Sequence, residues 1–190
     1  MEVKDIFGEL PRLETNRLIL RKITLDDSSD LFEYAQDPEI TRYVSWQPHK
    51  KIEDSKEFLK TVIQKYKDGK VSIWGIVYKG DKKFIGTCGY LWWFPAHSRA
   101  EIAYALSRRY WNKGLMTEAV REVIRFGFEE MKLNRIEARC VVGNIASEKV
   151  LKKVGMQFEG IIREQMFFKE AYQDLKLYSI LRSEYNEKYR

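Results

Sequence analysis

A short segment near the middle of the chain constrains the fold more than any other. An apolar, strand-like run, Ala100–Leu106, leads through the loop Arg108–Gly114 into an amphipathic helix that starts near Leu115. A strand, a short loop and a helix N-terminus together form an anion site, because the first amides of a helix lack partners and its dipole is positive there. The glycine patterns of P-loops and dinucleotide folds, GxxxxGKS/T and GxGxxG, are both missing from the sequence. We therefore expect a compact pyrophosphate-binding loop carrying Lys113 and Gly114, suited to a cofactor such as coenzyme A.

The composition is that of a globular protein with a full core. With 190 residues, 44% hydrophobic and 33% charged, we expect a single domain over residues 1–190. The first residues are acidic where an export signal needs basic and then apolar residues, and the apolar run Cys88–Phe94 is too short to span a bilayer. Cys88 and Cys140 both lie in strand-like runs, so buried free thiols are favoured over a disulfide. These features predict a cytoplasmic protein without a membrane segment.

The net charge of +6 is compatible with two interpretations. A basic surface suits a polyphosphate ligand or an acidic partner such as RNA or a ribosome. A solvated surface with surplus lysine explains the same charge, and the sequence has no arginine-rich tail or aromatic RNA-binding signature.

The hydrophobic periodicity predicts alternating strands and helices along the whole chain. We expect strands over residues 13–21, 71–78, 84–94, 100–106, 136–142, 158–168 and 171–181, and helices over residues 27–36, 54–69, 115–129 and 145–154. Asn144 is expected to cap the last of these helices, which Gly155 closes. The order predicts a mixed α/β or α+β fold, in which helices pack on a sheet.

This order of elements resembles the GNAT superfamily of acetyl-coenzyme A-dependent N-acetyltransferases over nearly the whole chain. Several motifs look like its RimJ/RimL branch, which contains acetyltransferases of ribosomal-protein N-termini. They are Leu13-x-Thr15-x-Arg17-Leu18-x-Leu20-Arg21, Ala100–Tyr104, Tyr110–Ala119, Asn144-x-x-Ser147 and Tyr172-x-Asp174. The resemblance implies a largely antiparallel central sheet flanked by helices, acetyl-coenzyme A as acetyl donor, and no metal.

The resemblance also implies a set of cofactor-binding residues around the loop. They are Leu106, Trp111, Asn112, Lys113, Gly114, Leu115, Met116, Thr117 and Asn144. The family loop usually reads Arg/Gln-x-x-Gly-x-Gly/Ala, whereas this chain has Trp111 at the first position and Met116 at the last. Asn112 stands where a second glycine is common, and asparagine is among the few residues that tolerate left-handed geometry. A backbone amide at Leu106 or its neighbours is expected to stabilise the oxyanion.

The expected chemistry needs a proton donor for the departing thiolate and a base for the amine. Many family members carry a tyrosine donor seven residues after the capping asparagine, where this chain has Leu151. In the RimJ/RimL branch a serine is the usual substitute, and Ser147 stands at that place; an ordinary first-turn serine is the alternative. Glu101 is the candidate base, unless it merely pairs with a basic residue across the sheet. The glutamate that some RimJ/RimL enzymes use corresponds to Met166.

Several further residues have a less certain assignment from sequence alone. Glu164 is a weaker candidate base, and Arg108 and Arg109 either reach the 3′-phosphate of the cofactor or face water. Aromatic residues that fit an acceptor groove, core packing or a dimer interface are Tyr43, Trp46, Trp92, Trp93 and Phe94. The two histidines, His49 and His97, form no zinc motif or Ser-His-Asp set with other residues.

The leading expectation is therefore an enzyme that transfers acetyl directly to the N-terminal α-amino group of a protein, such as a ribosomal protein. A small-amine acceptor (an aminoglycoside, polyamine or amino acid) is the nearest alternative, and an acidic, closed acceptor pocket would favour it. A non-catalytic module that binds acyl-coenzyme A is the alternative from a different class. A homodimer is compatible with each of these.

Overall fold

A computed structural model describes residues 2–189 and has one eight-stranded sheet with the order β1-β2-β3-β4-β5-β6-β8-β7. Its strands are β1 (Leu13–Glu14), β2 (Leu18–Arg21), β3 (Ile73–Tyr78), β4 (Phe84–Phe94), β5 (Arg99–Leu106), β6 (Arg135–Val141), β7 (Gln157–Phe168) and β8 (Ala171–Leu181). Neighbouring strands pair antiparallel except β5 and β6, which are parallel. The predicted mixed, largely antiparallel sheet is confirmed.

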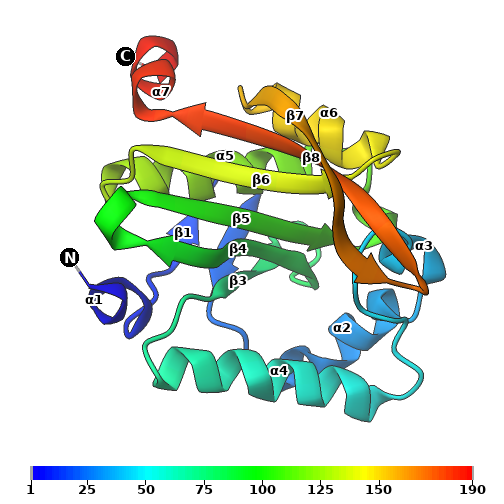
Figure 1. Ribbon diagram of the computed structural model, residues 1–190. Coiled ribbons are helices and arrows are strands. Elements are labelled where there is room, and N and C mark those ends of the chain that lie inside the picture. Colours follow the sequence, from blue (N-terminus) through cyan, green and yellow to red (C-terminus); the bar gives the residue numbers. More distant parts are fainter. Residues whose placement is uncertain (1, 190) are drawn as a thin grey trace.

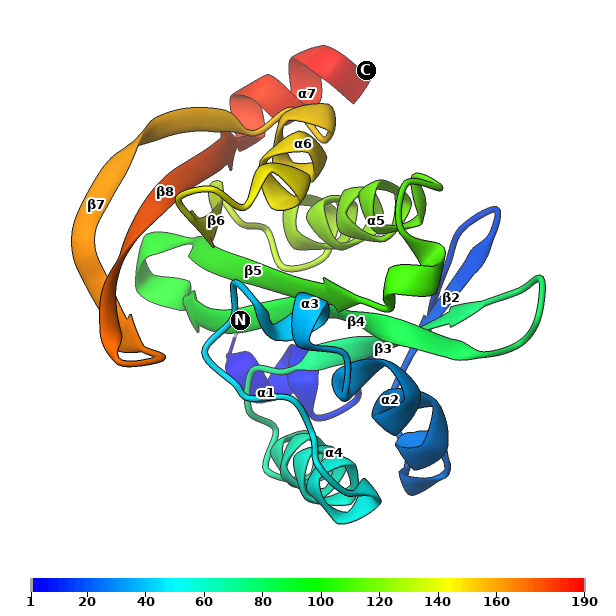
Figure 2. The ribbon, with the colours of Figure 1, turned by 90° about the vertical axis from the view of Figure 1, so that its right-hand side faces the viewer.

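Helices cover both faces of the sheet (Figures 1 and 2). Helices α5 (Leu115–Glu129) and α6 (Ile145–Lys153) lie on one face, and α2 (Ser28–Ala35) and α4 (Ile52–Lys67) lie on the other, as Figure 2 shows. The shorter helices are α1 (Val3–Phe7), α3 (Pro38–Thr41) and α7 (Arg182–Tyr189), with single 3-10 turns η1 (Leu25–Asp27), η2 (Pro95–His97) and η3 (Arg108–Tyr110).

Local sequence chemistry explains why the main elements form where they do. The apolar positions of α5 are buried, while Arg125 on its outer side pairs with Glu122 and Glu129. Asn144 caps α6 by accepting a hydrogen bond from the Ser147 amide at 3.1 Å. The β7–β8 turn is formed by residues 169 and 170, both at positive φ, the geometry of a tight hairpin turn.

The predicted single strand over residues 13–21 is wrong, because a turn divides it into β1 and β2. The Thr15 hydroxyl accepts a hydrogen bond from the Leu18 amide at 3.0 Å, and the Thr15 amide donates to the Leu18 carbonyl, also at 3.0 Å. No glycine or proline marks this turn, so the apolar alternation runs straight through it. Helices α1, α3 and α7 were not predicted, because a helix this short or polar shows little hydrophobic periodicity.

Strands β5 and β6 separate part of the way along their length. Their pairing covers only Arg99–Glu101 on β5, while β5 stays paired with β4 as far as Leu106. The Ser107 amide donates to the Ile85 carbonyl, on the β4 side, at 2.8 Å. Because backbone groups alternate in direction along an antiparallel strand, those of Tyr104 and Leu106 face the opening toward β6. This opening positions the candidate site.

Candidate functional site

The loop between β5 and α5 makes two left-handed turns before the helix begins. Asn112 has φ 59° and Gly114, the N-cap of α5, has φ 73°. The Trp111 indole donates to the Leu106 carbonyl at 2.8 Å, which fixes the loop against the end of β5. Asparagine and glycine are the residues that adopt this geometry most readily, so the tight loop follows from the residues present.

The start of α5 presents unpaired amides. In the part of the chain that the structure describes, none of the amides of residues 112–117 donates to a protein acceptor; the first helical bond runs from Glu118 to the Gly114 carbonyl. A Cβ atom added at Gly114 would meet only the Arg17 guanidinium, at 3.6 Å. The amides therefore face open space at the positive end of a fifteen-residue helix dipole. This geometry fits a diphosphate.

A clamp from the N-terminal hairpin holds this loop. The Glu118 carboxylate accepts hydrogen bonds from the Thr15 hydroxyl at 2.6 Å and from the Arg17 side chain at 2.7 Å. Arg17 also donates to the Lys113 carbonyl at 2.9 Å. Burial opposes ionisation of Glu118, but the bonds from Thr15 and Arg17 and the charge of Arg17 together lower its pKa below the ordinary value. Sequence analysis noted Thr15 and Arg17 only as a family motif, since their partner is about a hundred residues away.

A cavity of about 560 Å³ extends from this loop along α6. Its lining includes most of the residues expected to bind the cofactor, namely Leu106, Trp111, Asn112, Gly114, Met116, Thr117 and Asn144. Lys113 and Leu115 do not line it: the Lys113 ammonium lies 5.3 Å from the Tyr110 ring centroid, and Leu115 is buried in the core. Lys149 and Lys153 of α6 line it instead, and sequence analysis missed both. We refer to this space as the donor cavity.

Arg108 and Arg109 are not among the residues that line the donor cavity. Both are exposed; Arg108 lies 3.8 Å from the Asp37 carboxylate and Arg109 lies 3.9 Å from that of Glu33. The geometry therefore favours the alternative in which these arginines face water.

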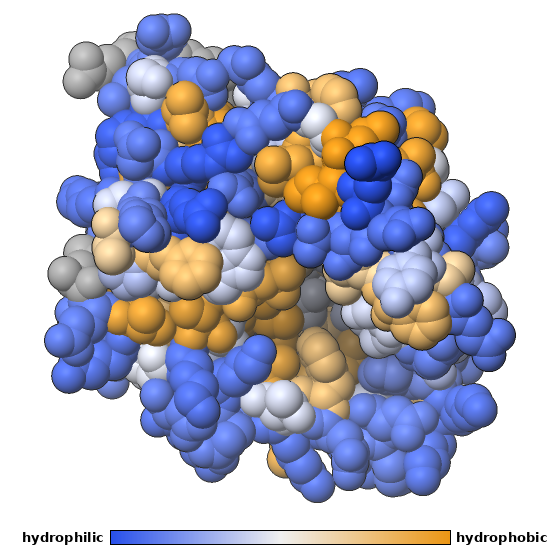
Figure 3. All heavy atoms as spheres, in the orientation of Figure 1, coloured by the Kyte–Doolittle hydropathy of each residue, from blue (hydrophilic) through white to orange (hydrophobic). Residues whose placement is uncertain are grey.

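A second cavity, of about 590 Å³, lies between the sheet and helices α2 and α4. Figure 3, in the orientation of Figure 1, shows a hollow near the middle of the molecule, with apolar side chains along its walls. Tyr43, Trp46 and Trp92 line it, whereas Trp93 is buried in the core and Phe94 is exposed. The expected aromatic group is thus divided between a cavity wall, the core and the surface. We call this space the acceptor cavity.

The two cavities meet at the point where β5 and β6 separate. Tyr43, Val44, Tyr104 and Ala105 line both of them. The Tyr104 hydroxyl lies 2.8 Å from the Ser147 hydroxyl, and burial raises the pKa of Tyr104, with the Ser147 hydrogen bond opposing. Sequence analysis did not single out Tyr104; the available signal was a polar hydroxyl between two alanines on the strand before the loop.

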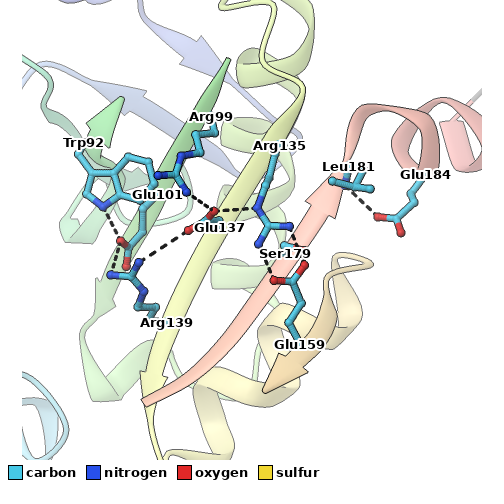
Figure 4. A network of polar contacts seen from close by, with 10 residues as sticks. All are labelled: Trp92, Arg99, Glu101, Arg135, Glu137, Arg139, Glu159, Ser179, Leu181 and Glu184. Atoms are coloured by element: carbon cyan, nitrogen blue, oxygen red, sulfur yellow. Dashed lines mark hydrogen bonds and ion pairs between the residues drawn. The ribbon is translucent and has the colours of Figure 1, made fainter. Parts of the chain in front are cut away.

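Glu101 lines the acceptor cavity and is held by two donors (Figure 4). The Trp92 indole donates to its Oε2 at 2.6 Å, and the Arg139 guanidinium lies 3.2 Å from the same oxygen. Burial raises the pKa of Glu101, and Arg139 and Trp92 oppose this rise. Met166 also lines the cavity, but the exposed Glu164 is not among the described lining residues.

His49 is a further polar group in the acceptor cavity. Its Nδ1 lies 2.7 Å from the hydroxyl of the fully buried Ser55, and burial lowers its pKa, with the charge of Asp54 opposing. Cys140 lines the same cavity, and both Cys140 and Cys88 are buried free thiols. Among residues 2–189, no group of three or more His, Cys, Asp or Glu side chains is placed to hold a metal ion, and no helix is long and apolar enough to cross a membrane.

This geometry, with a helix N-terminus and a separated strand pair along one cavity and a second cavity next to it, fits the class of proteins that join a phosphate-bearing ligand to a second substrate. Residues 17–157 match the model of the acetyltransferase (GNAT) domain. The chain is 35% identical over 173 residues to an uncharacterised N-acetyltransferase of Bacillus licheniformis, covering 91% of this chain and 97% of that protein. It therefore belongs to the GNAT family and is an N-acetyltransferase.

Two further similarities are to acetyltransferases of ribosomal proteins. A ribosomal-protein-serine acetyltransferase of Escherichia coli is 28% identical over 104 residues, which is 55% of this chain and 58% of that protein. The solved structure of RimL, a ribosomal-protein α-N-acetyltransferase in complex with coenzyme A, has the same fold. It superposes with a TM-score of 0.80 at 17% identity and covers 90% of this chain and 98% of that one.

Proposed function

We propose that this enzyme transfers acetyl from acetyl-coenzyme A directly to the N-terminal α-amino group of a cytoplasmic protein, such as a ribosomal protein. The observation that carries the proposal is the meeting of the two cavities at Tyr104 and Ala105. A helix N-terminus lies along one cavity and a mostly apolar wall along the other. The coenzyme A complex of RimL and the similarity to the ribosomal-protein-serine acetyltransferase of Escherichia coli support this choice of donor and acceptor.

On the donor side, acetyl-coenzyme A supplies the thioester, and the chain supplies the contacts. The unpaired amides from Asn112 to Thr117 would hold the diphosphate, and Asn144, which lines the same cavity, would contact the arm that leads to the sulfur. The Leu106 amide, which faces the opening between β5 and β6, donates to the developing oxyanion. The Tyr104 and Ser147 hydroxyls, 2.8 Å apart, deliver a proton to the departing thiolate.

On the acceptor side, Glu101 accepts the amine proton through a water. A free α-amino group has a pKa of about 7.7–8.0, so it needs only modest help to lose this proton. Burial raises the pKa of Glu101, which makes its carboxylate a better base than an exposed one. Because Arg139 pairs with Glu101, the cavity offers no surplus negative charge to a polycation. This favours a peptide N-terminus over a polyamine or an aminoglycoside.

A panel of acceptors tests the proposal. Purified enzyme and acetyl-coenzyme A are incubated with peptides that have free N-termini, the same peptides with blocked N-termini, spermidine, an aminoglycoside and free amino acids. We expect thiol release only with the free peptides, and mass spectrometry should place one acetyl group on the α-nitrogen. Turnover of the small amines with no peptide turnover would refute the proposed acceptor.

A further inference from the structure

The acceptor cavity has a chemical character that points to one kind of substrate. Its wall is built mainly from apolar and aromatic side chains contributed by the helices, the sheet and the β7–β8 hairpin. Large members of this wall include Trp46, Phe58, Leu91, Trp92 and Met166. Figure 3 shows the same apolar lining around the hollow. An aromatic or long aliphatic group is the ligand that gains most from such a wall.

The charged groups of this cavity offset one another. Glu101 pairs with Arg139, and the neighbouring buried Glu137 is contacted by Arg135 and Arg99 as well as by Arg139 (Figure 4). Burial lowers the pKa of His49, which disfavours a charged imidazole in this cavity. A charged side chain entering this cavity would therefore lose its hydration without gaining a free counter-ion.

Small residues on the sheet and on α2 leave room for a bulky group in the acceptor cavity. Ala103 and Ala105 lie on β5, next to the cavity junction, and Ala35 of α2 also lines the acceptor cavity. Ala103 is not part of the donor cavity, so a larger side chain at this position would fill the acceptor cavity alone.

We infer that the acceptor carries its primary amine next to a large apolar group, as in a peptide whose first residue is phenylalanine, leucine or methionine. This inference rests on the proposed function and deepens it, because it names the side chain that the acceptor cavity binds. A single methylene in an apolar pocket changes kcat/KM by about 10- to 200-fold. A whole apolar side chain should therefore produce a clear preference.

The test uses peptides that are identical except for a first residue of Phe, Leu, Met, Ser, Lys or Asp, together with phenethylamine. We expect kcat/KM to be at least about tenfold higher for Phe, Leu and Met than for Ser, and lowest for Lys and Asp. If phenethylamine is turned over as fast as the Phe peptide, a small amine with an apolar group is as good an acceptor as the peptide. This result would support the inferred recognition of the apolar group. A preference for Ser, Lys or Asp would overturn the inference and leave the proposed function standing.

Two test variants and one control variant sharpen the test. Ala103→Leu should lower kcat/KM for the Phe peptide by about tenfold or more, with little change for the Ser peptide. Ala96→Leu, at an exposed position outside both cavities, is the matched control and should change neither value. Phe58→Glu, on a partly exposed turn of α4, should raise activity toward the Lys peptide and lower it toward the Phe peptide.

Each outcome is separable from a failure of the proposed function. Phe58→Glu covers the case in which Ala103→Leu does not fold, because glutamate is a good helix former at an accessible site. If neither variant changes the ratio between Phe and Ser peptides, the acceptor cavity does not bind the first side chain. If no peptide is acetylated at all while acetyl-coenzyme A binds, the proposed function itself is overturned.

Discussion

Removing the Tyr104 hydroxyl tests the proposed proton donor. In the folded protein this hydroxyl lies 2.8 Å from that of Ser147, at the junction of the two cavities. If the bond is only structural, Tyr104→Phe should cost about 1 kcal/mol of stability, which lowers Tm by about 2–4 °C for a chain of this size. If the pair delivers a proton, the chemical step should slow by about 10²- to 10⁴-fold. We predict the second result, with KM for acetyl-coenzyme A changed little.

The assay is thiol release at saturating acetyl-coenzyme A, together with thermal unfolding of the same samples. Tyr66→Phe is the matched control, because the Tyr66 hydroxyl donates to the Ile73 carbonyl at 2.6 Å and is not among the described lining residues. The double variant of Tyr104 and Ser147 should be no slower than the slower single variant, since the two hydroxyls act as one unit. A kcat within threefold of wild type in Tyr104→Phe, with a Tm change like that of Tyr66→Phe, would refute the proton-delivery role.

Three further predictions follow from the electrostatics of the site and the sheet. Arg17→Gln removes the guanidinium bonds to Glu118 and to the Lys113 carbonyl, and should weaken acetyl-coenzyme A binding by about tenfold in calorimetry, with a smaller change in kcat; unaltered affinity would contradict the positioning role. Glu101→Gln should abolish the acidic limb of the kcat/KM–pH profile, a limb that in the wild type lies above the ordinary glutamate pKa; retention of this limb would exclude Glu101 as the base. The bonds from Arg135 and Ser179 hold the pKa of Glu159 at about 2, so its contribution to stability is present above about pH 4.3 and is lost as the pH falls toward 2. Glu159→Gln should then flatten the fall in Tm over this pH range, and an unchanged slope would count against the pairing with Arg135.

Residues close together in the sequence explain most of what could be predicted. Three local properties predicted features that the structure has: the apolar period of α5, the capping of α6 by Asn144, and the left-handed backbone of Asn112. The order of these elements was enough to predict a sheet covered by helices. It was also enough to locate the helix N-terminus that forms one end of the donor cavity.

The remaining features depend on contacts between distant residues. The bond between Thr15 and Glu118 joins the N-terminal hairpin to α5, and that between Tyr104 and Ser147 joins β5 to α6. The separation of β5 from β6 is a property of sheet pairing that hydrophobic alternation does not reveal. For the same reason, sequence analysis could propose Glu101 as a base, or as the partner of a basic residue across the sheet, but could not identify that residue as Arg139.

Calorimetric comparison of acetyl-coenzyme A with acetylpantetheine tests the central claim most directly, because acetylpantetheine keeps the thioester but lacks the diphosphate and the adenosine 3′-phosphate attached to it. If the amides at the start of α5 bind the diphosphate, acetyl-coenzyme A should bind saturably with one site per chain and at least about 100-fold more tightly, which corresponds to about 2.7 kcal/mol. Equal affinity for the two compounds, or no saturable heat from acetyl-coenzyme A with folded protein, would contradict the account.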